Sequence, residues 1–349
     1  GAYNKISQDV ADGVTDFVAA SAGNHAQGVA LAATKCGADS TIYMPTDAPQ
    51  AKVDATRSYG ATVELVGKDF QETMSHAQAA VEETNAEFVH AYDDTDIIAG
   101  QGTLGTEMYH DCPDADTVIV PIGGGGLISG ISTAMKHLSP ETRVVGVQAT
   151  GAETVHESLD KGMPVTLDEV DTIADGIAVR QVGEKTFEVI QERVDEVVTV
   201  GDSAIATALI DLLERSKTLV EGAGAISLAA VLEDAFDYEE GEVIVPALCG
   251  GNIDLNVLRT VITRGLVEDG RYLKIKTVLK DRPGALERLI EIIADARANI
   301  YGIQHERTSL DMRIDQTEVE LDLEMRGHEH ILELIDELEA HGYPVDVLV

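Results

Sequence analysis

The chain has 349 residues, 44% of them apolar, so it is long enough for two or three domains with sizeable cores. No uninterrupted apolar run reaches the roughly 18 residues that a transmembrane helix needs. The first residues, Gly1 to Ile6, lack an initiator Met, a basic flank and an apolar stretch. They are therefore not a signal peptide, and we expect a cytoplasmic chain that is either processed or incomplete.

The net charge is −37, and the acidic residues are spread along the whole chain. Such a charge repels itself, and dissolved salt screens it within a Debye length of about 3 Å at 1 M. We interpret the charge as an adaptation to a salty cytoplasm, the alternative being an ordinary acidic protein. The surface is unfavourable for nucleic acid and anionic membranes. Cys36, Cys112 and Cys249 have no metal or redox spacing, which fits a reducing compartment.

From residue 16 to about residue 267, short β-branched runs alternate with helical stretches. Strands are expected at 17–20, 41–44, 62–66, 117–121, 144–147 and 242–245, and helices at 26–35, 70–83 and 127–137. This repetition predicts an α/β fold with parallel sheets covered by helices on both faces. We expect two lobes with a cleft between them, the smaller at about 16–93, in a catalytic domain that spans 1–268.

After Gly270 the pattern changes. Strands are expected at 272–279, 299–307, 317–325 and 344–348, and helices at 285–296 and 329–340. This β-α-β-β-α-β order is that of a ferredoxin-like unit, so residues 270–349 are predicted to form a second domain.

The first site-forming motif lies between the expected strand 17–20 and the following helix. It combines Ser21, Gly23, Asn24 and His25. A helix start offers unpaired backbone N–H groups and a positive dipole end, which suits a carboxylate or phosphate. A plain helix cap by Ser21 is the alternative, but the clustering of polar residues favours a binding site.

The second motif is a run of four glycines before the helix that starts at Leu127. It consists of Gly123, Gly124, Gly125 and Gly126. Four glycines let the backbone wrap an anion without interference from Cβ atoms. No Gly-Lys-Ser/Thr follows, and Ile128 and Ser129 stand where a dinucleotide fingerprint needs Gly or Ala. The motif predicts a phosphate of neither ATP nor NAD, with a flexible turn as the alternative.

The third motif is Cys249-Gly250-Gly251-Asn252, directly after the expected strand 243–248. A small polar group at the carboxyl end of a strand points into the cleft of an α/β sheet. A lone cysteine is more often a buried small hydrophobe, so that reading stays open. Glu221 precedes another helix, and both a capping role and a role in the site are open for it.

Together these motifs resemble the fold-type II family of pyridoxal-phosphate (PLP) enzymes, most closely the threonine dehydratases (threonine ammonia-lyases). The matching segments are 1–6, 21–28, 99–103, 123–126, 174–176 and 249–252. The tail resembles an ACT domain, a small-molecule sensor often fused to these enzymes. The resemblance implies a two-lobed fold-type II enzyme followed by a ferredoxin-like ACT domain.

The resemblance also implies roles for the motif residues. The four glycines and Leu127 would hold the PLP phosphate through backbone N–H groups. Asn24 would bond the phenolic oxygen, and Ser21, Asn24 and His25 would line the pocket for the substrate carboxylate. Cys249 would lie beside the pyridine nitrogen, where a neutral thiol leaves the nitrogen largely unprotonated and favours elimination.

Two departures from related serine racemases sharpen this picture. Ala22 stands where those enzymes have a second serine that moves a proton, so racemisation is disfavoured. Gln148 and Thr154 stand where they have a Glu and an Asp that bind a divalent metal, so no metal site is expected.

A third departure concerns the Schiff-base lysine. The family carries it in a Ser-Phe-Lys-x-Arg-Gly-Ala segment, of which this chain has only Gly1-Ala2. The lysine is therefore expected three residues before Gly1, no catalytic residue is assigned within the chain, and the chain as written should bind PLP weakly and non-covalently. Lys5 would lie roughly 10 Å from that position at 1.5 Å per residue, so we expect it to be a helix-surface residue.

The resemblance implies deaminating dehydration of L-threonine to 2-oxobutanoate and ammonia, with L-serine giving pyruvate as a side activity. The role would be isoleucine biosynthesis or threonine catabolism. One alternative is a β- or γ-replacement enzyme of the cysteine or threonine synthase type. The other is a pseudo-enzyme that binds an amino acid without chemistry.

In the tail, the resemblance implies an amino-acid effector, for which isoleucine is favoured, and a homo-oligomer, either a dimer or a tetramer. The alternative is that the tail only holds subunits together. The effector contacts would come from Asp281, Pro283, Gly284, Ala285, Leu286 and Asn299.

Overall fold

The computed structural model describes residues 1–306, 313 and 315–349. The chain divides into two compact units, Gly1–Ile253 and Asp254–Val349. Helix α11 (Leu255–Glu268), which we expected in the catalytic domain, therefore groups with the C-terminal unit. The reason is local bonding, because Arg271 N–H donates to the Leu266 carbonyl at 2.7 Å and His328 Nε2 lies 2.8 Å from the Glu268 carbonyl.

The smaller lobe of the N-terminal unit is built on a four-stranded parallel sheet of order β3-β2-β1-β4. The strands are β1 (Asp16–Ala20), β2 (Asp39–Met44), β3 (Thr62–Leu65) and β4 (Glu87–Phe88). The helices are α1 (Ala2–Ala11), α2 (Asn24–Cys36), α3 (Gln50–Ser58) and α4 (Phe70–Thr84).

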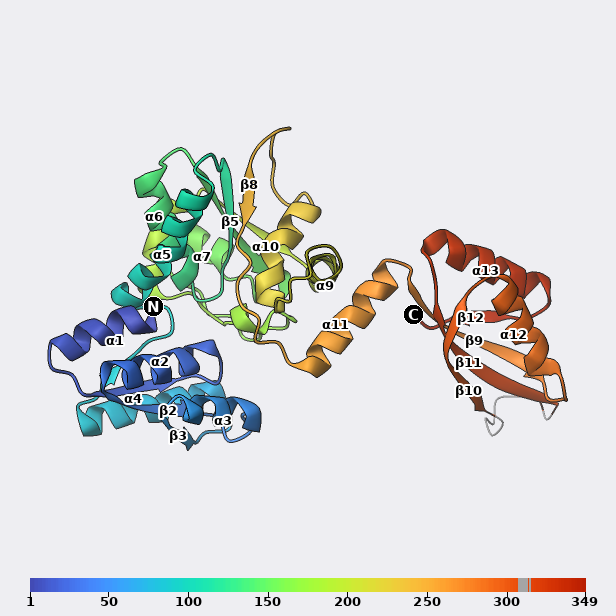
Figure 1. Cartoon of the computed structure of the whole chain (residues 1–349), viewed down its shortest axis with the longest axis horizontal. Helices are drawn as coiled ribbons and strands as arrows, with labels where there is room; N and C mark the ends of the chain where they lie inside the picture. Colours follow the sequence, from blue (N-terminus) through green and yellow to red (C-terminus); the bar gives the residue numbers. More distant parts are fainter. Residues whose placement is uncertain (307–312, 314) are drawn as a thin grey trace. The chain divides into compact units, whose positions relative to one another are not determined.

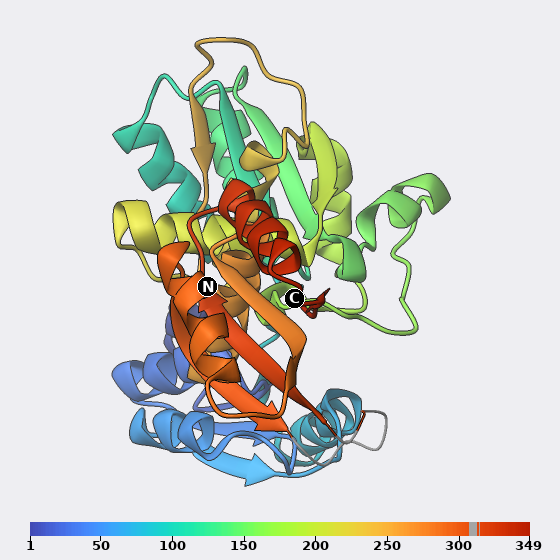
Figure 2. The ribbon, with the colours of Figure 1, turned by 90° about the vertical axis from the view of Figure 1, so that its right-hand side faces the viewer.

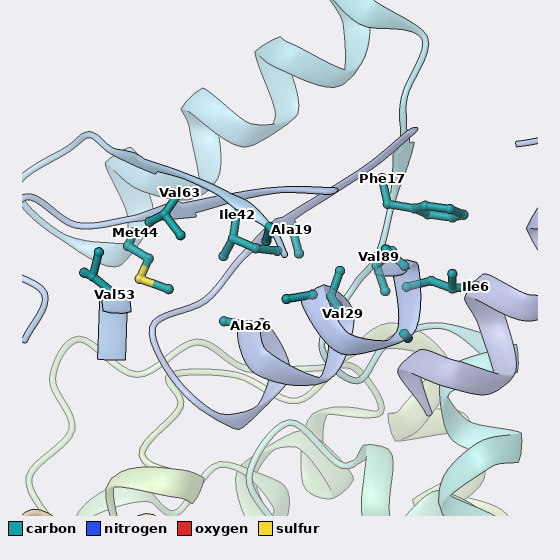
Figure 3. Close-up of a cluster of buried hydrophobic side chains, with 14 of the residues drawn as sticks. Ile6, Phe17, Ala19, Ala26, Val29, Ile42, Met44, Val53, Val63 and Val89 are labelled. Atoms are coloured by element: carbon teal, nitrogen blue, oxygen red, sulfur yellow. The ribbon is translucent and has the colours of Figure 1, made fainter. Parts of the chain in front are cut away.

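Alternation along β1 places helices on both faces of this sheet. Phe17 and Ala19 face α2, where they join a core with Val29, and Ile6 of α1 lies in the same cluster (Figure 3). Val18 and Ala20 belong to a separate cluster that includes residues of α4. Because successive side chains of a strand point to opposite faces, the apolar residues of β1 face helices on both sides of the sheet, as predicted.

The larger lobe carries a second parallel sheet of order β7-β6-β5-β8, which lies apart from the first (Figure 2). Its strands are β5 (Thr117–Pro121), β6 (Arg143–Ala149), β7 (Glu196–Val200) and β8 (Ile244–Pro246). Its helices are α5 (Thr95–Asp111), α6 (Gly126–Leu138), α7 (Val155–Lys161), α8 (Glu184–Arg193), α9 (Asp202–Asp211) and α10 (Gly222–Leu232), with short helical turns at Thr150–Ala152, Asp175–Ile177 and Leu212–Ser216.

The predicted elements of this unit are present, with small shifts at their ends. The strand expected at 117–121 has those bounds, whereas the strand expected at 242–245 begins at Ile244. The Asp116 carboxylate accepts the Val243 N–H at 2.8 Å, so that amide bonds a side chain before the ladder begins.

The C-terminal unit confirms the predicted β-α-β-β-α-β order (Figure 1). Its elements after α11 are β9 (Tyr272–Lys280), α12 (Ala285–Asp295), β10 (Asn299–Glu306), β11 (Gln316–Glu324), α13 (His328–Ala340) and β12 (Val345–Val347). The antiparallel sheet has the order β10-β11-β9-β12. Arg307, the expected end of the second strand of this unit, lies outside the described residues.

Alternating burial along β9 and β11 gives this sheet one apolar and one charged face. Ile275 and Leu321 join a core with Leu289 of α12 and Leu334 of α13. Cross-strand ion pairs join Lys274 to Glu320 and Lys276 to Glu318, at 3.1 and 3.2 Å. Over the part of the chain that the structure describes, no helix has the length and apolar character needed to cross a bilayer.

Candidate active site

Sheet topology brings two of the predicted motifs to one edge of the larger lobe. β5 and β8 are neighbouring parallel strands, with Ile119 paired to Pro246. Both carboxyl ends therefore lie side by side, and the glycine run follows one while Cys249 follows the other. The carboxyl edge of a parallel sheet is where ligands bind in α/β proteins.

The glycine run presents unpaired backbone amides to this edge. Gly125 adopts the left-handed conformation (φ 91°) and is the N-cap of α6. The first intrahelical bond is Ser129 N–H to the Gly125 carbonyl at 3.0 Å. The N–H groups of Gly126, Leu127 and Ile128 precede that bond, so they remain available to an anion at the positive end of the helix dipole.

Close packing shows that this turn requires glycine. A Cβ atom on Gly124 would come within 2.3 Å of the Tyr92 ring, and one on Gly126 within 2.8 Å of the Tyr92 Cβ. A Cβ on Gly125 would meet Thr186 at 2.8 Å. The alternative of a flexible turn therefore does not hold, since the backbone forms a tightly enclosed cradle whose donors fit a phosphate.

Hydrogen bonds from the start of α8 hold the cradle in place. Thr186 Oγ1 donates to the Gly124 carbonyl at 2.7 Å, and the Gly183 N–H donates to the same oxygen at 3.2 Å. The Asp93 carboxylate in turn accepts the N–H of Lys185 at 2.9 Å and of Thr186 at 3.2 Å. These bonds fix the start of α8 and so orient the cradle.

Tyr92, Asp93 and Thr186 were not among the predicted site residues. His90 Nδ1 accepts the N–H groups of Tyr92 and Asp93, at 3.2 and 2.8 Å, which shapes the turn that presents them. The available signal was the polar run Tyr92-Asp93-Asp94 between a strand and a helix. Thr186 had no sequence signal, because its role depends on the packing of α8.

The loop that carries Cys249 is anchored on the start of α10. Glu221 N–H donates to the Gly250 carbonyl at 3.2 Å, and a Cβ on Gly250 would lie 2.2 Å from Glu221 Oε1. A Cβ on Gly224 would lie 2.2 Å from the Cys249 carbonyl oxygen. The glycines therefore allow two segments to approach at a distance that any larger residue would prevent.

Glu221 faces this loop and does not cap its own helix. Its side chain makes no capping bond to α10. Its Oε1 lies against Gly250 and also against Gly176, where a Cβ would come within 2.8 Å. Burial raises the pKa of the Glu221 carboxyl. Of the two open readings for this residue, the structure favours a place in the site.

The Cys249 thiol is held neutral. Burial, aided by the nearby charge of Glu221, raises its pKa to about 12. At physiological pH the thiol therefore carries its proton. A neutral thiol is what we expect beside a pyridine nitrogen that stays unprotonated.

The start of α2 forms the opposite wall of the site. Ser21 Oγ accepts the Gly23 N–H at 3.1 Å, which leaves the hydroxyl proton free to donate. Gly23 is the N-cap, with Asn24 as the first helical residue. Asn24 Oδ1 accepts a hydrogen bond from Asn252 Nδ2 at 3.1 Å, so the first and third motifs are in direct contact.

His25 has one side-chain nitrogen committed to the protein. Its Nε2 donates to the Val89 carbonyl at 2.9 Å, which fixes the tautomer with a lone pair on Nδ1. Burial lowers the pKa of His25 to about 4. The ring therefore adds no positive charge for a carboxylate, and the donor that His25 can offer an anion is its backbone N–H in the first turn of α2.

Successive contacts connect the motifs into one site. A Cβ on Gly123 would meet the Ile177 Cα at 2.9 Å, and Ile177 follows Gly176, against which Glu221 lies. Glu221 anchors the loop that ends at Asn252, and that residue contacts Asn24. The cofactor and carboxylate motifs predicted from the sequence therefore surround one region between the lobes of the N-terminal unit.

Gln148 and Thr154 are fully buried and bonded to each other. Gln148 Nε2 donates to Thr154 Oγ1 at 3.1 Å and to the Ala152 carbonyl at 3.2 Å, and Gln148 Oε1 accepts the N–H groups of Thr154 and Val155. The Gln148 amide thus links β6 to the turn at residues 152–154 and to the start of α7. Within the described ranges, no group of three or more His, Cys, Asp or Glu side chains could hold a metal ion.

The expectation that Lys5 is a helix-surface residue is wrong. Lys5 is 5% exposed, and its Nζ lies 3.2 Å from Asp9, 3.1 Å from Glu87 and 3.3 Å from Asp94. Burial lowers the pKa of Lys5, but the bond to Glu87 and the charges of Asp94 and Asp9 outweigh burial and raise it above its ordinary value. Helix periodicity located this residue but could not show which segments cover it.

The predicted effector residues do not converge within one chain. Asn299 pairs with Glu324, which pairs with Tyr272 at the start of β9. Asp281 directly follows the far end of β9, and the N-cap Gly284 (φ 85°) lies in the same loop. At about 3.4 Å per residue, the length of β9 places Asn299 roughly 30 Å from Asp281. Asn299 Nδ2 instead donates to Glu324 Oε2 at 3.0 Å.

A hollow of about 410 Å³ occurs elsewhere in the larger lobe. It is lined by Asp116, Thr117, Arg143, Asp237, Tyr238, Glu239 and Glu242. Thr117 and Arg143 start β5 and β6, so this hollow lies at the amino ends of the strands, opposite the edge that carries the motifs. Its position and its acidic lining exclude it as the phosphate site.

The fold and this site define a pyridoxal-phosphate-dependent enzyme. Residues 1–250 match the family described as "Pyridoxal-phosphate dependent enzyme", and the chain belongs to that family. The phosphate cradle, Asn24 and the neutral Cys249 fit this cofactor.

Relatives narrow the class further. An L-threonine ammonia-lyase of Geobacter sulfurreducens is 50% identical over 331 residues, which cover 95% of this chain and 82% of the relative. An L-threonine ammonia-lyase of Thermotoga maritima is 44% identical over 349 residues, which cover 100% of this chain and 86% of the relative. Among solved structures, the processed form of threonine deaminase isoform 2 from Solanum lycopersicum is 38% identical, with a TM-score of 0.71 over 75% of this chain and 77% of that chain.

Proposed function

We propose that this protein is a threonine ammonia-lyase, which converts L-threonine to 2-oxobutanoate and ammonia. The proposal rests on the joint presence of the phosphate cradle, the start of α2 as a place for a carboxylate, and a neutral Cys249. The two relatives that align with 95% and 100% of this chain are both named L-threonine ammonia-lyase. L-Serine, which has the same β-hydroxyl group, would give pyruvate as a side activity.

The phosphate of pyridoxal phosphate would be held by the amides from Gly123 to Leu127. Bound pyridoxal phosphate supplies an electron sink for the substrate carbon that loses its proton. The neutral thiol of Cys249 would lie beside the ring nitrogen, where it would not favour protonation of that nitrogen as a charged partner would. A weaker sink favours loss of the β-hydroxyl over longer-lived carbanion chemistry.

The substrate carboxylate would be bound at the start of α2. The Ser21 hydroxyl proton is free to donate because its oxygen already accepts the Gly23 N–H. The backbone N–H groups of Asn24 and His25 add two donors at the positive end of the helix dipole. A neutral His25 ring, pinned to Val89, keeps this surface rigid without adding a proton donor.

Ala22 favours dehydration over racemisation. A racemase must return a proton to the opposite face of the substrate carbon, which takes a titratable group on that face. The methyl side chain of Ala22 neither accepts nor donates a proton. We therefore expect no D-serine from L-serine.

The test measures 2-oxobutanoate from L-threonine and pyruvate from L-serine, using protein expressed from the whole gene. Absence of keto acid from both substrates refutes the proposal. A product formed only with an added thiol or from a phosphate-ester substrate would support the replacement alternative. A gene without a lysine codon at the expected place would support the non-catalytic alternative.

We also propose that the C-terminal unit is an ACT-type sensor, through which an effector regulates the enzyme allosterically. The enzyme would be a homo-oligomer, and we propose that it works in a salty cytoplasm to which its acidic surface is adapted. The β-α-β-β-α-β order of the C-terminal unit and the left-handed Gly284 at the start of α12 support the sensor assignment. Isoleucine is the favoured effector, with a role in isoleucine biosynthesis. Unchanged isoleucine binding after deletion of 270–349 would refute the assignment.

A further inference from the structure

The amide side chains of Asn24 and Asn252 join the two lobes of the N-terminal unit. Asn252 Nδ2 donates to Asn24 Oδ1 at 3.1 Å. Asn24 opens α2 in the smaller lobe, whereas Asn252 ends the loop that follows β8 in the larger lobe. Because an amide has its acceptor on one side and its donors on the other, this bond determines which side of Asn24 faces away from Asn252.

The loop that presents Asn252 is fixed in place by its own packing. Gly250 has φ 78°, and its carbonyl accepts the Glu221 N–H at 3.2 Å. The Cys249 carbonyl lies so close to Gly224 that a Cβ there would come within 2.2 Å. Asn252 is therefore held by a backbone that α10 anchors, and its amide is a fixed reference against which Asn24 can orient.

The phenolic oxygen of pyridoxal phosphate is ionised at mildly alkaline pH, so it accepts hydrogen bonds and donates none. Asn24 can bind it through Nδ2 but would repel it through Oδ1. With Oδ1 engaged by Asn252, the Nδ2 donors of Asn24 are directed to the other side. We propose that Asn252 is a positioning residue that holds Asn24 with its donors toward the phenolic oxygen of the cofactor.

This inference rests on the proposed role of Asn24, and it makes a polarity-specific prediction. Aspartate at position 252 could only accept, so Asn24 would turn its donors to it and its oxygen toward the phenolic oxygen. A hydrogen bond to a charged oxygen is lost, which weakens cofactor binding by about tenfold to a hundredfold. Alanine at 252 removes the orienting bond alone, for a loss of about fivefold.

The experiment titrates the 349-residue chain calorimetrically with pyridoxal phosphate and with 3-deoxypyridoxal phosphate, which lacks only the phenolic oxygen. The variants are Asn252→Asp, Asn252→Ala and Asn24→Ala. The matched control is Asn256→Asp, the same change at an exposed residue four positions along the chain.

We expect both Asn252 variants to weaken binding of pyridoxal phosphate, Asp more than Ala, while the 3-deoxy compound binds all variants alike. Equal losses for both compounds would show that Asn252 only maintains the loop, and would overturn the inference. Unchanged binding in Asn252→Asp, or a loss no larger than in Asn256→Asp, would overturn it too. If Asn24→Ala discriminates between the compounds and the Asn252 variants do not, positioning fails while the role of Asn24 stands. If Asn24→Ala does not discriminate, the role of Asn24 itself fails.

Discussion

Replacement of Lys5 by methionine is expected to destabilise the N-terminal unit strongly, because it removes the charge but keeps most of the side-chain volume. Lys5 Nζ contacts three carboxylates, of Asp9, Glu87 and Asp94, at 3.1 to 3.3 Å. Asp94 also caps α5 by accepting the N–H groups of the next turn. The methionine variant would leave three like charges together with no cation among them.

The structure sets the size of this loss. Removing one partner of a fully buried ion pair costs about 3–5 kcal/mol. The Lys5 side chain is 7% exposed, but the carboxylates of Asp9 and Asp94 are 20% and 19% exposed and that of Glu87 is 45% exposed, so water recovers part of their solvation. We therefore expect a loss of about 2–3 kcal/mol in the free energy of unfolding.

The assay is urea unfolding followed by circular dichroism at fixed salt. The matched control is Lys68→Met, because Lys68 pairs with Glu72 at 2.9 Å while its side chain is 77% exposed. An exposed pair of this kind contributes little to stability, because water solvates both of its charges. If Lys5→Met costs no more than Lys68→Met, the buried charge cluster does not stabilise the lobe and the reasoning is refuted.

Three further predictions concern His25, the cradle and the net charge. The pKa of His25 is lowered to about 4 in the folded protein, so below pH 6.5 the unfolded chain binds more protons than the folded one. The free energy of unfolding therefore falls as the pH falls. His25→Gln should reduce this loss of stability between pH 7 and pH 4 by up to about 3 kcal/mol, as measured by unfolding curves at each pH. Gly125→Ala, at φ 91° and against Thr186, should weaken pyridoxal phosphate at least about tenfold by calorimetry, whereas Gly201→Ala, which meets nothing within 4 Å, should not. With a net charge of −37, molar KCl should raise the melting temperature by about 10 °C or more in a thermal scan, and a rise of only a few degrees would favour an ordinary acidic protein.

Local patterns in the sequence predicted much of the fold. The strand at 117–121 was predicted with its observed bounds, because four consecutive β-branched residues followed by a proline leave little ambiguity. The tail was predicted as a β-α-β-β-α-β unit because the period of β9 and β11 is two and that of α12 is near 3.6. The phosphate cradle was predicted because a run of glycines before a helix has few other uses.

What the sequence could not predict depends on packing between distant segments. Lys5 was predicted to be a surface residue because the sequence of its own helix does not reveal its contacts with Glu87 and Asp94, which belong to other segments of the chain. The link between Asn24 and Asn252 spans 228 positions, so no local pattern reveals it. His25 was predicted to line the pocket for the substrate carboxylate, and the Val89 carbonyl that bonds its ring is likewise remote in the sequence.

Strand direction also decides how an effector site in the tail could be built. Asn299 lies at the Tyr272 end of β9 and Asp281 follows its other end, so one small molecule cannot contact both residues of the same chain. If both bind an effector together, each must come from a different chain. Effector binding would then stabilise the pairing of two tails, because a ligand that binds only the associated state shifts the equilibrium toward that state. The proposed sensor and the proposed oligomer are therefore one hypothesis in physical terms.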